Sequence, residues 1–540
     1  MASMGEEAAA ATQAKPRIGG YAWYALFVLV LVYIVNFIDR HIISILVGDI
    51  QRDLNVEPAQ IGFLYGTAFA VFYALFGIPL GRLADSWYRG RLMAIGLALW
   101  SSMTALSGFA TSFGMLAAAR IGVGIGEASA SPAAYSMISD SFPKERRATA
   151  LSIYSSGLYI GGALSLPIGG LVVAKWNAAY PIVADAPLGL AGWQAAFLAV
   201  GLPGLLLALW VLTLREPMRG ASEGRPQPVV RPNAWRDFGK ELVAILPPLT
   251  LLNVARIPGA LMPNLLALGL TAIIGYGLYL VTGTGAQWLA YGLGVYAIFS
   301  WVQSLKHRDP PVYALIWGSP VVLILAIAFG SISFVTYATS FWIPFYVEEH
   351  FYGGGAAPAH YLAGLTAKAE VGLIIGSTSA ASAAIGVILG GYLSDLWRQR
   401  DPRGRIFVNM LSVVLPIPLI GFLLTTENLA AFYWVNPIAH MFASAWVGAA
   451  VATLQDLVLP RMRATAGATY ILGTTMVGLA LGPYFAGQMM GLADRNIAVG
   501  IAALYFMPVL TLIGLWIGAR HLATLEATKV ERARAAGEPV

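Results

Sequence analysis

The chain has 540 residues, of which 58% are hydrophobic and 11% charged, and its formal net charge at pH 7 is +6. Soluble domains carry about 25% charged residues, so this composition excludes a soluble globule and indicates a membrane protein with several spans. The sequence contains no cysteine, which excludes disulfides, cysteine metal sites and thiol catalysis.

The first twenty residues are small or polar and include Glu6, Glu7, Lys15 and Arg17. The apolar run that follows them is too long for the core of a signal peptide and has no clear small-residue cleavage site after it. We therefore expect this run to be retained as the first membrane helix, preceded by a cytoplasmic tail.

Apolar segments of bilayer length recur along the whole chain. Crossing a bilayer takes roughly 20 apolar residues, and such segments must be helical to satisfy their backbone groups. The pattern predicts an all-α polytopic membrane protein with about fourteen transmembrane helices. They lie at about 22–48, 59–80, 93–112, 114–137, 150–174, 192–214, 259–282, 286–303, 313–346, 362–392, 406–425, 429–454, 464–491 and 497–519.

The positive charges are distributed unevenly between the two sides of these spans. With the N-terminus in the cytoplasm, 26 of the 33 Lys and Arg residues fall on cytoplasmic segments, and Arg52, Lys175 and Arg495 fall outside. This is the positive-inside pattern, which the opposite orientation would invert. The basic charge is therefore a topology signal that places both termini in the cytoplasm. No basic patch lies on a soluble domain, so we expect no nucleic-acid partner.

Two turns of the chain repeat in the same order. Residues 81–91 are echoed at 391–400, and residues 140–150 are echoed at 456–466, at separations of roughly 310 to 316 residues. This repeat implies two homologous halves with the same orientation in the membrane. Parallel six-helix halves are a known transporter plan, with the substrate site between them near the middle of the bilayer.

The repeat also identifies what is additional in this chain. Six helices in each half leave the pair at 259–282 and 286–303 as an inserted hairpin, preceded by a linker rich in Pro, Arg and Gly. The expected domains are an N-terminal tail (1–21), an N-terminal six-helix bundle (22–215), a cytoplasmic linker (216–258), the hairpin (259–305), a C-terminal six-helix bundle (306–519) and a C-terminal tail (520–540).

The turn at 81–91 resembles the motif that follows the second helix in the major facilitator superfamily. Its repeat at 391–400, the charged turn ending at Arg147 and the Arg215-Glu216-Pro217 end of the sixth helix are similar to the same family. The resemblance covers about twelve of the fourteen predicted helices. It implies the major facilitator fold, from which the inserted hairpin departs.

A finer resemblance lies in the first and fourth helices. The stretch Asn36-Phe37-Ile38-Asp39-Arg40, together with the segment from Arg120 to Glu127 and the following Pro132, resembles the Spinster-like transporters of sphingolipids and lysophospholipids. This likeness implies a lipid-like substrate.

Four ionisable residues lie inside these two helices: Asp39, Arg40, Arg120 and Glu127. Asp39, Arg120 and Glu127 fall within about 10 Å of each other in depth, and buried charges of this kind usually face a bundle interior or a water-filled path. We expect Asp39 and Glu127 to be proton-responsive acids with Arg40 and Arg120 as partners, and Arg40, Arg120 and Glu127 to contact substrate. The alternative is a static ion-pair network that only fixes helix packing.

The repeated turns supply a second set of candidates. The resemblance implies that contacts of Asp85 with Arg89 or Arg147 lock the cytoplasmic side in an outward-open state, with Asp395 and Arg398 as counterparts in the second half. The alternative is ordinary positive-inside anchoring. The predicted cytoplasmic gate comprises Gly81, Asp85, Arg89, Arg91, Arg147, Asp395 and Arg398.

The second half is poorer in buried charge and richer in aromatic and hydroxyl groups. This asymmetry suits an amphipathic substrate with one polar head. Histidine ordinarily titrates near neutral pH, so a functional role is one expectation for His440, with a packing role as the alternative. Lys368 and Glu370 are expected to be exposed or mutually paired at the outer start of the eighth core helix. The substrate-binding candidates in this half are Thr336, Tyr337, Phe341, Trp342, His440 and Tyr470.

Enzyme signatures are missing from the sequence. There is no Walker loop, and no cluster of His and carboxylates has metal-ligand spacing. The run Gly122-Val123-Gly124-Ile125-Gly126 lies inside a span, where small residues permit close helix packing. We therefore expect no enzyme activity, no metal and no cofactor.

The sequence predicts a proton-coupled secondary active transporter that works by alternating access in the cell membrane, such as the inner membrane of a bacterium. The resemblance makes a lysophospholipid or sphingoid-type lipid the expected substrate, and we expect a monomer in the lipid bilayer. The alternatives are a drug, sugar-acid or organic-anion porter, and a receptor or scaffold that kept the fold without transport. A membrane-embedded lipid-modifying enzyme is disfavoured by the missing catalytic constellation.

Overall fold

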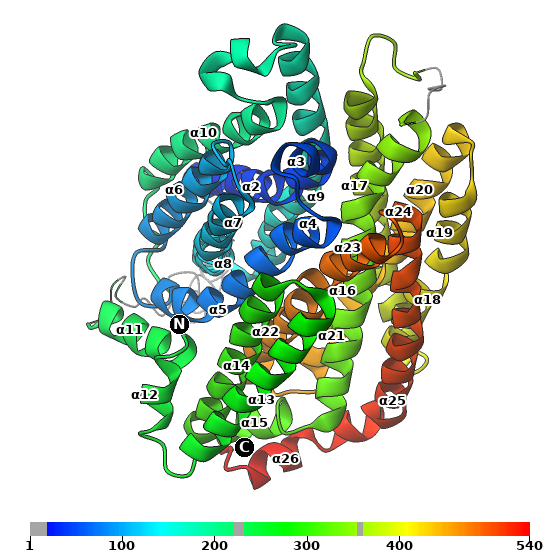
Figure 1. Cartoon of the computed structure of the whole chain (residues 1–540). Helices are drawn as coiled ribbons and strands as arrows, with labels where there is room; N and C mark the ends of the chain where they lie inside the picture. The colour runs from blue at the N-terminus through cyan, green and yellow to red at the C-terminus, as the bar shows by residue number, and fades with distance from the viewer. Residues whose placement is uncertain (1–18, 220–227, 229, 231, 354–359, 540) are drawn as a thin grey trace, which may run out of the picture.

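The computed structural model describes the chain apart from residues 1–18, 220–227, 229, 231, 354–359 and 540. The described residues are helices joined by loops and contain no strand, which confirms the all-α fold (Figure 1). Most of the predicted tail at 1–21 and part of the predicted linker at 216–258 lie outside the described residues.

The first group of helices covers the N-terminal part of the chain. It consists of α2 (Gly20–His41), α3 (Val47–Leu54), α4 (Pro58–Tyr65), α5 (Thr67–Ala84), α6 (Arg89–Ser107), α7 (Phe113–Glu127), α8 (Ala130–Ser141), α9 (Lys144–Ala179) and α10 (Gly192–Leu212). A middle segment follows, with α11 (Ala234–Ile245), α12 (Thr250–Val254), α13 (Leu261–Thr282) and α14 (Gly285–Arg308). The last two helices pack against each other as a hairpin.

The second group of helices covers the C-terminal part. It consists of α15 (Pro310–Leu315), α16 (Pro320–Val347), α17 (Ala367–Arg398), α18 (Gly404–Val414), α19 (Pro416–Thr425), α20 (Leu429–Ser444), α21 (Trp446–Asp456), α22 (Arg463–Gly473), α23 (Gly482–Leu492), α24 (Ile497–Ala502), α25 (Met507–Ala527) and α26 (Lys529–Ala535). A π-helical stretch, Thr474–Leu479, joins α22 to α23.

Eleven helices among the described residues are long and apolar enough to cross a membrane. This number is below the fourteen predicted from the sequence. The helix α6 starts with Arg89 and Arg91, and α7 and α8 are separate helices of 15 and 12 residues. The helix α14 carries a buried polar face that includes Gln287 and Ser300. These features weaken the hydrophobic signal of three segments that the sequence pattern had included.

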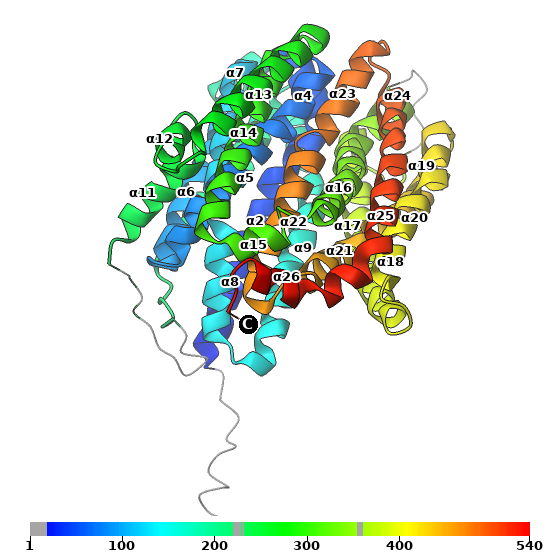
Figure 2. The same ribbon diagram turned by 90° about the horizontal axis from the view of Figure 1, so that it is seen from below.

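The two ends of the helix bundle are named here by their charged residues. The basal side carries Arg89 and Arg398, and the distal side carries Asp49, Glu57 and Lys368. In Figure 2, α15, α26 and the C-terminus lie toward the basal side, and α23 and α24 toward the distal side.

Close packing joins the two groups on the distal side. A Cβ at Gly62 or Gly66 would collide with the carbonyl oxygens of Pro483 and Leu479, and a Cβ at Gly372 would lie 2.6 Å from the Leu166 carbonyl oxygen. Backbone therefore meets backbone where α4 crosses α23 and where α9 crosses α17. Small residues at such crossings let membrane helices approach closely.

Candidate functional site

A buried ion pair links the first and fourth predicted membrane helices. The Arg40 Nη2 of α2 donates to the Glu127 Oε2 of α7 over 2.6 Å, and the two side chains are 9% and 0% exposed. The local sequence allows this contact because Gly124 and Gly126 of α7 lie against backbone atoms of Phe69 and Gly96. The structure thus places two of the four predicted proton-coupling residues in direct contact.

The other two residues of this set meet differently. The Arg120 Nη1 donates to the backbone carbonyl of Asp39 over 3.2 Å, and its Nε donates to the Leu64 carbonyl over 3.4 Å. The Asp39 side chain is fully buried, and its two carboxylate oxygens have no ion-pair partner among the described residues, although the Trp100 and Thr104 side chains lie next to them. A buried carboxylate without a cation at its oxygens is costly when charged, so Asp39 differs chemically from Glu127, which is paired with Arg40.

Aromatic rings surround the two guanidinium groups. The Arg40 Cζ lies 4.7 Å from the Phe37 ring centroid, 4.5 Å from that of Phe69 and 5.3 Å from that of Tyr73. The Arg120 Cζ lies 5.8 Å from the Phe69 centroid. Cations over ring faces gain about 0.5–2 kcal/mol. This cluster of Asp39, Arg40, Arg120, Glu127 and its rings is called the charged cluster below.

Two further residues, which no sequence motif singled out, connect the charged cluster to the second group. The His41 Nδ1 lies 3.4 Å from the Tyr65 hydroxyl. The Tyr65 ring stacks on the predicted substrate residue Phe341 of α16, with centroids 4.2 Å apart and an interplanar angle of 17°. Only the position of His41 beside Arg40 was visible as a signal in the sequence.

The predicted residues of the second group fall into different surroundings. Thr336 and His440 line one cavity of about 100 Å³, and the His440 Nε2 lies 3.4 Å from the Ser340 hydroxyl. Trp342 points elsewhere, because its Nε1 donates to the Pro483 carbonyl over 3.0 Å. The Tyr470 ring packs against Trp446 at a centroid distance of 6.0 Å. Tyr337 is half-buried on α16, one turn before Phe341.

The cavity around His440 contrasts with the charged cluster. Its lining holds seven Ser or Thr residues, Tyr505 and His440, with no Asp, Glu, Lys or Arg. The remaining lining residues are apolar or small. A neutral cavity with hydroxyl groups in apolar walls therefore lies in the second group, while the buried charges lie in the first.

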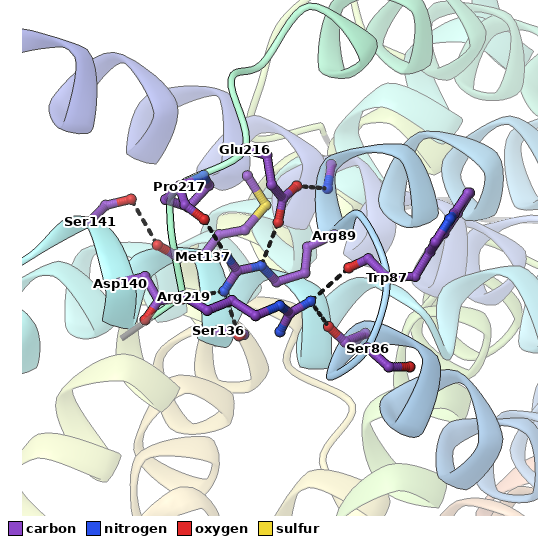
Figure 3. A network of polar contacts seen from close by, with 12 residues as sticks. Ser86, Trp87, Arg89, Ser136, Met137, Asp140, Ser141, Glu216, Pro217 and Arg219 are labelled. Atoms are coloured by element: carbon purple, nitrogen blue, oxygen red, sulfur yellow. Dashed lines mark hydrogen bonds and ion pairs between the residues drawn. The ribbon is translucent and has the colours of Figure 1, made fainter. Parts of the chain in front are cut away.

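On the basal side, Arg89 is the centre of a polar network (Figure 3). It pairs with Asp140 and, over 2.6 Å, with Glu216, and it donates to the Ser136 hydroxyl and the Pro217 carbonyl, each over 2.7 Å. These bonds tie the start of α6 to the end of α8 and to the segment after α10. The network joins helices within the first group.

The second group repeats this network. Arg398 pairs with Asp456 and, over 2.7 Å, with Glu526. Arg405 also pairs with Asp456, and it pairs with Asp395 over 2.9 Å. The predicted gate residues Arg89, Asp395 and Arg398 thus lie in two equivalent networks, one in each group.

The other predicted gate residues lie nearby on the basal side. Gly81 faces Pro132, with 3.9 Å from a built Cβ to the ring. The Arg91 guanidinium lies 4.5 Å from the Tyr88 ring centroid. Asp85 and Arg147 both take part in polar or electrostatic contacts. A latch between the two groups stays a prediction.

On the distal side, ion pairs connect the two groups. Lys368 of α17 donates to the Asp49 Oδ2 over 2.6 Å and pairs with Glu348 over 3.3 Å, and Arg495 pairs with Glu57 over 2.7 Å. The expectation that Lys368 is exposed or paired with Glu370 was wrong. Both residues are buried, because Lys368 turns to the first group.

Glu370 has its own set of donors. It accepts hydrogen bonds from the Tyr352 hydroxyl over 2.8 Å and from the Leu362 N–H over 3.2 Å, and it pairs with His360 over 3.1 Å. The sequence pattern did not predict these contacts, because Tyr352 and His360 precede α17, the helix that carries Glu370.

A family model, Major Facilitator Superfamily, matches residues 29–483 of the chain. The chain belongs to the Major Facilitator Superfamily. An MFS-type efflux pump of Mycolicibacterium smegmatis is 25% identical to it over 501 residues, covering 91% of both chains. Protein spinster of Drosophila melanogaster is 30% identical over 207 residues, which cover 38% of this chain and 32% of that protein.

Solved structures of the Major Facilitator Superfamily share the fold. A bacterial homologue of the human lysosomal transporter Spinster, crystallised in an inward-facing and unoccupied conformation, has 24% identity and a TM-score of 0.66 over 96% of this chain and 99% of its own. At 24% identity, this structural similarity shows that the two proteins share a fold. Membership of the superfamily makes the chain a secondary transporter of the membrane and not an enzyme.

Proposed function

We propose that the protein is a proton-coupled transporter that moves a single-chain amphiphile, such as a lysophospholipid or a sphingoid-type lipid, by alternating access. The observation that carries this proposal is the buried Arg40–Glu127 pair of 2.6 Å beside the Asp39 carboxylate, which has no arginine at its oxygens among the described residues. One acid of the cluster is therefore ion-paired, and the other has only neutral side chains at its carboxylate.

The difference between the two acids supports proton coupling. Removal of water disfavours a charged carboxylate, and a nearby guanidinium favours it. Glu127 has Arg40 as a direct partner, whereas Asp39 receives Arg120 only at its backbone carbonyl. We assign the transported proton to Asp39 and the exchange of partners to Glu127. An anionic head group that attracted Arg40 would release Glu127 to bind a proton.

The separation of charge from the neutral cavity supports an amphipathic substrate. Arg40 and Arg120 provide bidentate donors for a phosphate or carboxylate head, and the cavity near His440 offers apolar walls. The local likeness to Protein spinster points the same way. The competing candidate is a drug or organic-anion porter, which the full-length likeness to a mycobacterial efflux pump favours.

We further propose that α6, α7 with α8, and α14 also cross the bilayer, which gives fourteen spans. The basal side is then cytoplasmic, with both termini, and the domain limits are those expected from the repeat. The distal ion pairs and backbone contacts close the outer side. On this assignment the structure is an inward-facing state, as in the bacterial relative.

The experiment is uptake of radiolabelled lysophosphatidylcholine into proteoliposomes under a pH gradient. Asp39→Asn and Glu127→Gln should each reduce uphill accumulation to the level of protein-free vesicles. Asp237→Asn, a carboxylate-to-amide change at the exposed pair with Lys240, should leave accumulation unchanged.

Three outcomes decide between the candidates. Unchanged pH dependence in both cluster variants would remove the proton assignment. Uptake of glucarate without uptake of lysolipid would favour the organic-anion porter. Binding of lysolipid without any uphill movement would favour a receptor with the same fold.

A further inference from the structure

A cavity of about 630 Å³ lies on the distal side, where the turn of the hairpin meets both groups of helices. Its lining comes from α4 and the start of α7 in the first group, from the turn at residues 282–287, and from α23 in the second group. Figure 2 shows α4, α13 and α23 next to one another at this end of the bundle. Ligand sites commonly have volumes of about 300–1,000 Å³, and this one takes no part in the proposed function.

The walls of this distal cavity stand together because the distal side is closed. Gly487 of α23 lies against the backbone of Pro58 at the start of α4, where a Cβ would collide with the carbonyl oxygen. The turn of the hairpin is also bonded to α23, since the Gln488 Nε2 donates to the Thr282 carbonyl over 3.4 Å. Movement of α23 away from α4 would therefore remove one wall of the cavity.

The most deeply buried polar residue of the lining is an amide without partners. Gln287 is 1% exposed, and neither its Oε1 nor its Nε2 has a hydrogen-bond partner among the described residues. Leaving a buried amide unsatisfied is unfavourable, so a bound molecule that both donates and accepts hydrogen bonds would stabilise it. Gln60 and Gln488 add two half-buried amides to the same lining.

The charge of the lining restricts the class of ligand. Glu57 is 58% exposed and already pairs with Arg495 over 2.7 Å, and no Lys, Arg or His is among the described residues of the lining. An anion would therefore find no cation here. The rings of Phe63 and Phe113, with centroids 5.8 Å apart, supply an apolar part. Amides beside aromatic rings suit a neutral molecule with several hydroxyls, each of which donates and accepts.

We propose that the distal cavity binds a neutral sugar and that the bound sugar keeps the distal side closed. A ligand shifts a conformational equilibrium toward the state that it binds better. Because the walls come from both groups, the closed distal side presents the whole site and an opened one does not. The effect on transport rests on the proposed alternating access, whereas the binding of the sugar is independent of it.

Two glycines provide a matched pair of variants that differ in their place relative to the cavity. A Cβ at Gly491 of α23 would have no atom within 4 Å, and Gly491 lines the cavity. A Cβ at Gly421 of α19 is equally free, and Gly421 is exposed outside the lining. Gly491→Trp should therefore occupy the space of the sugar, and Gly421→Trp is its control.

A second variant removes the buried amide at nearly constant size. Gln287→Leu breaks no hydrogen bond among the described residues, so the melting temperature of the protein should stay equal or rise. A purely structural role for the amide would lower it instead. Gln399→Leu makes the same exchange at the exposed basal end of α17 and serves as the control.

The first experiment measures binding of radiolabelled maltose to the full chain in lipid nanodiscs, after purification in a detergent without sugar. The parent protein and both control variants should bind maltose saturably with the same Kd. Gln287→Leu should raise the Kd by about tenfold, and Gly491→Trp should abolish binding. Glucarate and choline, an anion and a cation, should not displace maltose.

The second experiment adds maltose to both sides of proteoliposomes that take up lysophosphatidylcholine. At about ten times its Kd, maltose should slow uptake by the parent protein by about tenfold, because roughly one molecule in eleven stays free of sugar. Uptake by Gly491→Trp, whatever its own rate, should be insensitive to maltose.

The outcomes separate the site from the proposed function. Absence of saturable maltose binding to the parent protein would overturn the inference, as would equal binding by Gly491→Trp and Gly421→Trp. Displacement of maltose by glucarate or choline would overturn the neutral class, and binding that leaves uptake unchanged would overturn the hold on the distal side. A parent protein that binds maltose but takes up no lysolipid would count against the proposed function. If Gly491→Trp does not elute as a folded protein, Gln287→Leu decides.

Discussion

The networks around Arg89 and Arg398 have similar ion pairs but different burial. Each arginine pairs with an aspartate at the end of a helix and with a glutamate, which follows α10 in the case of Glu216 and lies in the last turn of α25 in the case of Glu526. The Arg89 side chain is 0% exposed and its partners Asp140 and Glu216 are 15% and 13% exposed. The Arg398 side chain is 26% exposed, and Asp456 and Glu526 are 26% and 29% exposed.

The segment that follows each glutamate accounts for this difference. After Glu216 the chain folds back over the turn between α5 and α6, where Arg219 donates to the Ala84 carbonyl over 2.7 Å and to the Trp87 carbonyl over 2.6 Å (Figure 3). After Glu526, Lys529 donates to the Asp456 carbonyl over 2.7 Å. The two groups therefore form similar ion pairs, and the segment after each glutamate determines how far the paired side chains are exposed to water.

The largest effect is expected for Arg89→Ala. Removal of this arginine leaves Asp140 and Glu216 close together without their shared cation, and breaking a buried pair in this way costs about 3–5 kcal/mol. The free energy of unfolding in detergent should fall by that amount. Arg91→Ala is the matched control, because Arg91 is exposed and stacks on Tyr88. A loss equal to that of the control would show that burial does not distinguish the network.

A smaller effect is expected for Arg398→Ala, about 1 kcal/mol. Arg405 remains paired with Asp456 in this variant, so the aspartate keeps a cation. The double variant Arg398→Ala, Arg405→Ala removes both and should lose clearly more than the sum of the single changes, because the two arginines share one partner. Strict additivity of the two losses in the same unfolding measurement would contradict this shared role.

The sequence was a good guide to the fold because the signals are local and periodic. Long apolar runs predicted the helices, and the repeat of 81–91 at 391–400 predicted related turns in the two groups. The repeat aligns Arg89 with Gln399, so it did not predict that Arg398 would be the arginine that pairs with Asp456 and Glu526. The number of spans was less certain, because α7 and α8 break at Ala128 and Ser129, a feature with no composition signal.

The candidate site was predictable in its charges but not in its pairing. Depth along the helices placed Asp39, Arg120 and Glu127 at similar levels, yet it did not reveal that Glu127 would pair with Arg40 or that Arg120 would bond to the backbone of Asp39. The rotation of a helix depends on its neighbours, here on Gly124 and Gly126. Contacts between the groups, such as Asp49 with Lys368 and Tyr65 with Phe341, join residues far apart in sequence and left no pattern.

The smallest effect is expected at the exposed ion pairs of Arg461. This residue bonds to Asp309 over 2.9 Å and to Glu538 of the C-terminal segment. The hydrogen bond from Arg461 holds the pKa of Asp309 below its ordinary value. A carboxyl with a lowered pKa stabilises the fold above its ordinary pKa of about 4 and loses that contribution as the pH falls through its folded value.

Asp309→Asn should therefore lower the free energy of unfolding at pH 7 by at most a few tenths of a kcal/mol, because this pair is exposed and screened by salt. The difference from the parent protein should vanish once the pH is below the lowered pKa of Asp309, where the folded and unfolded states both bind the proton. Asp237→Asn, on α11 and away from Arg461, serves as the control. A difference that grew on acidification would mean that the Asp309 carboxyl opposes folding, and it would contradict the stabilising role of its bond with Arg461.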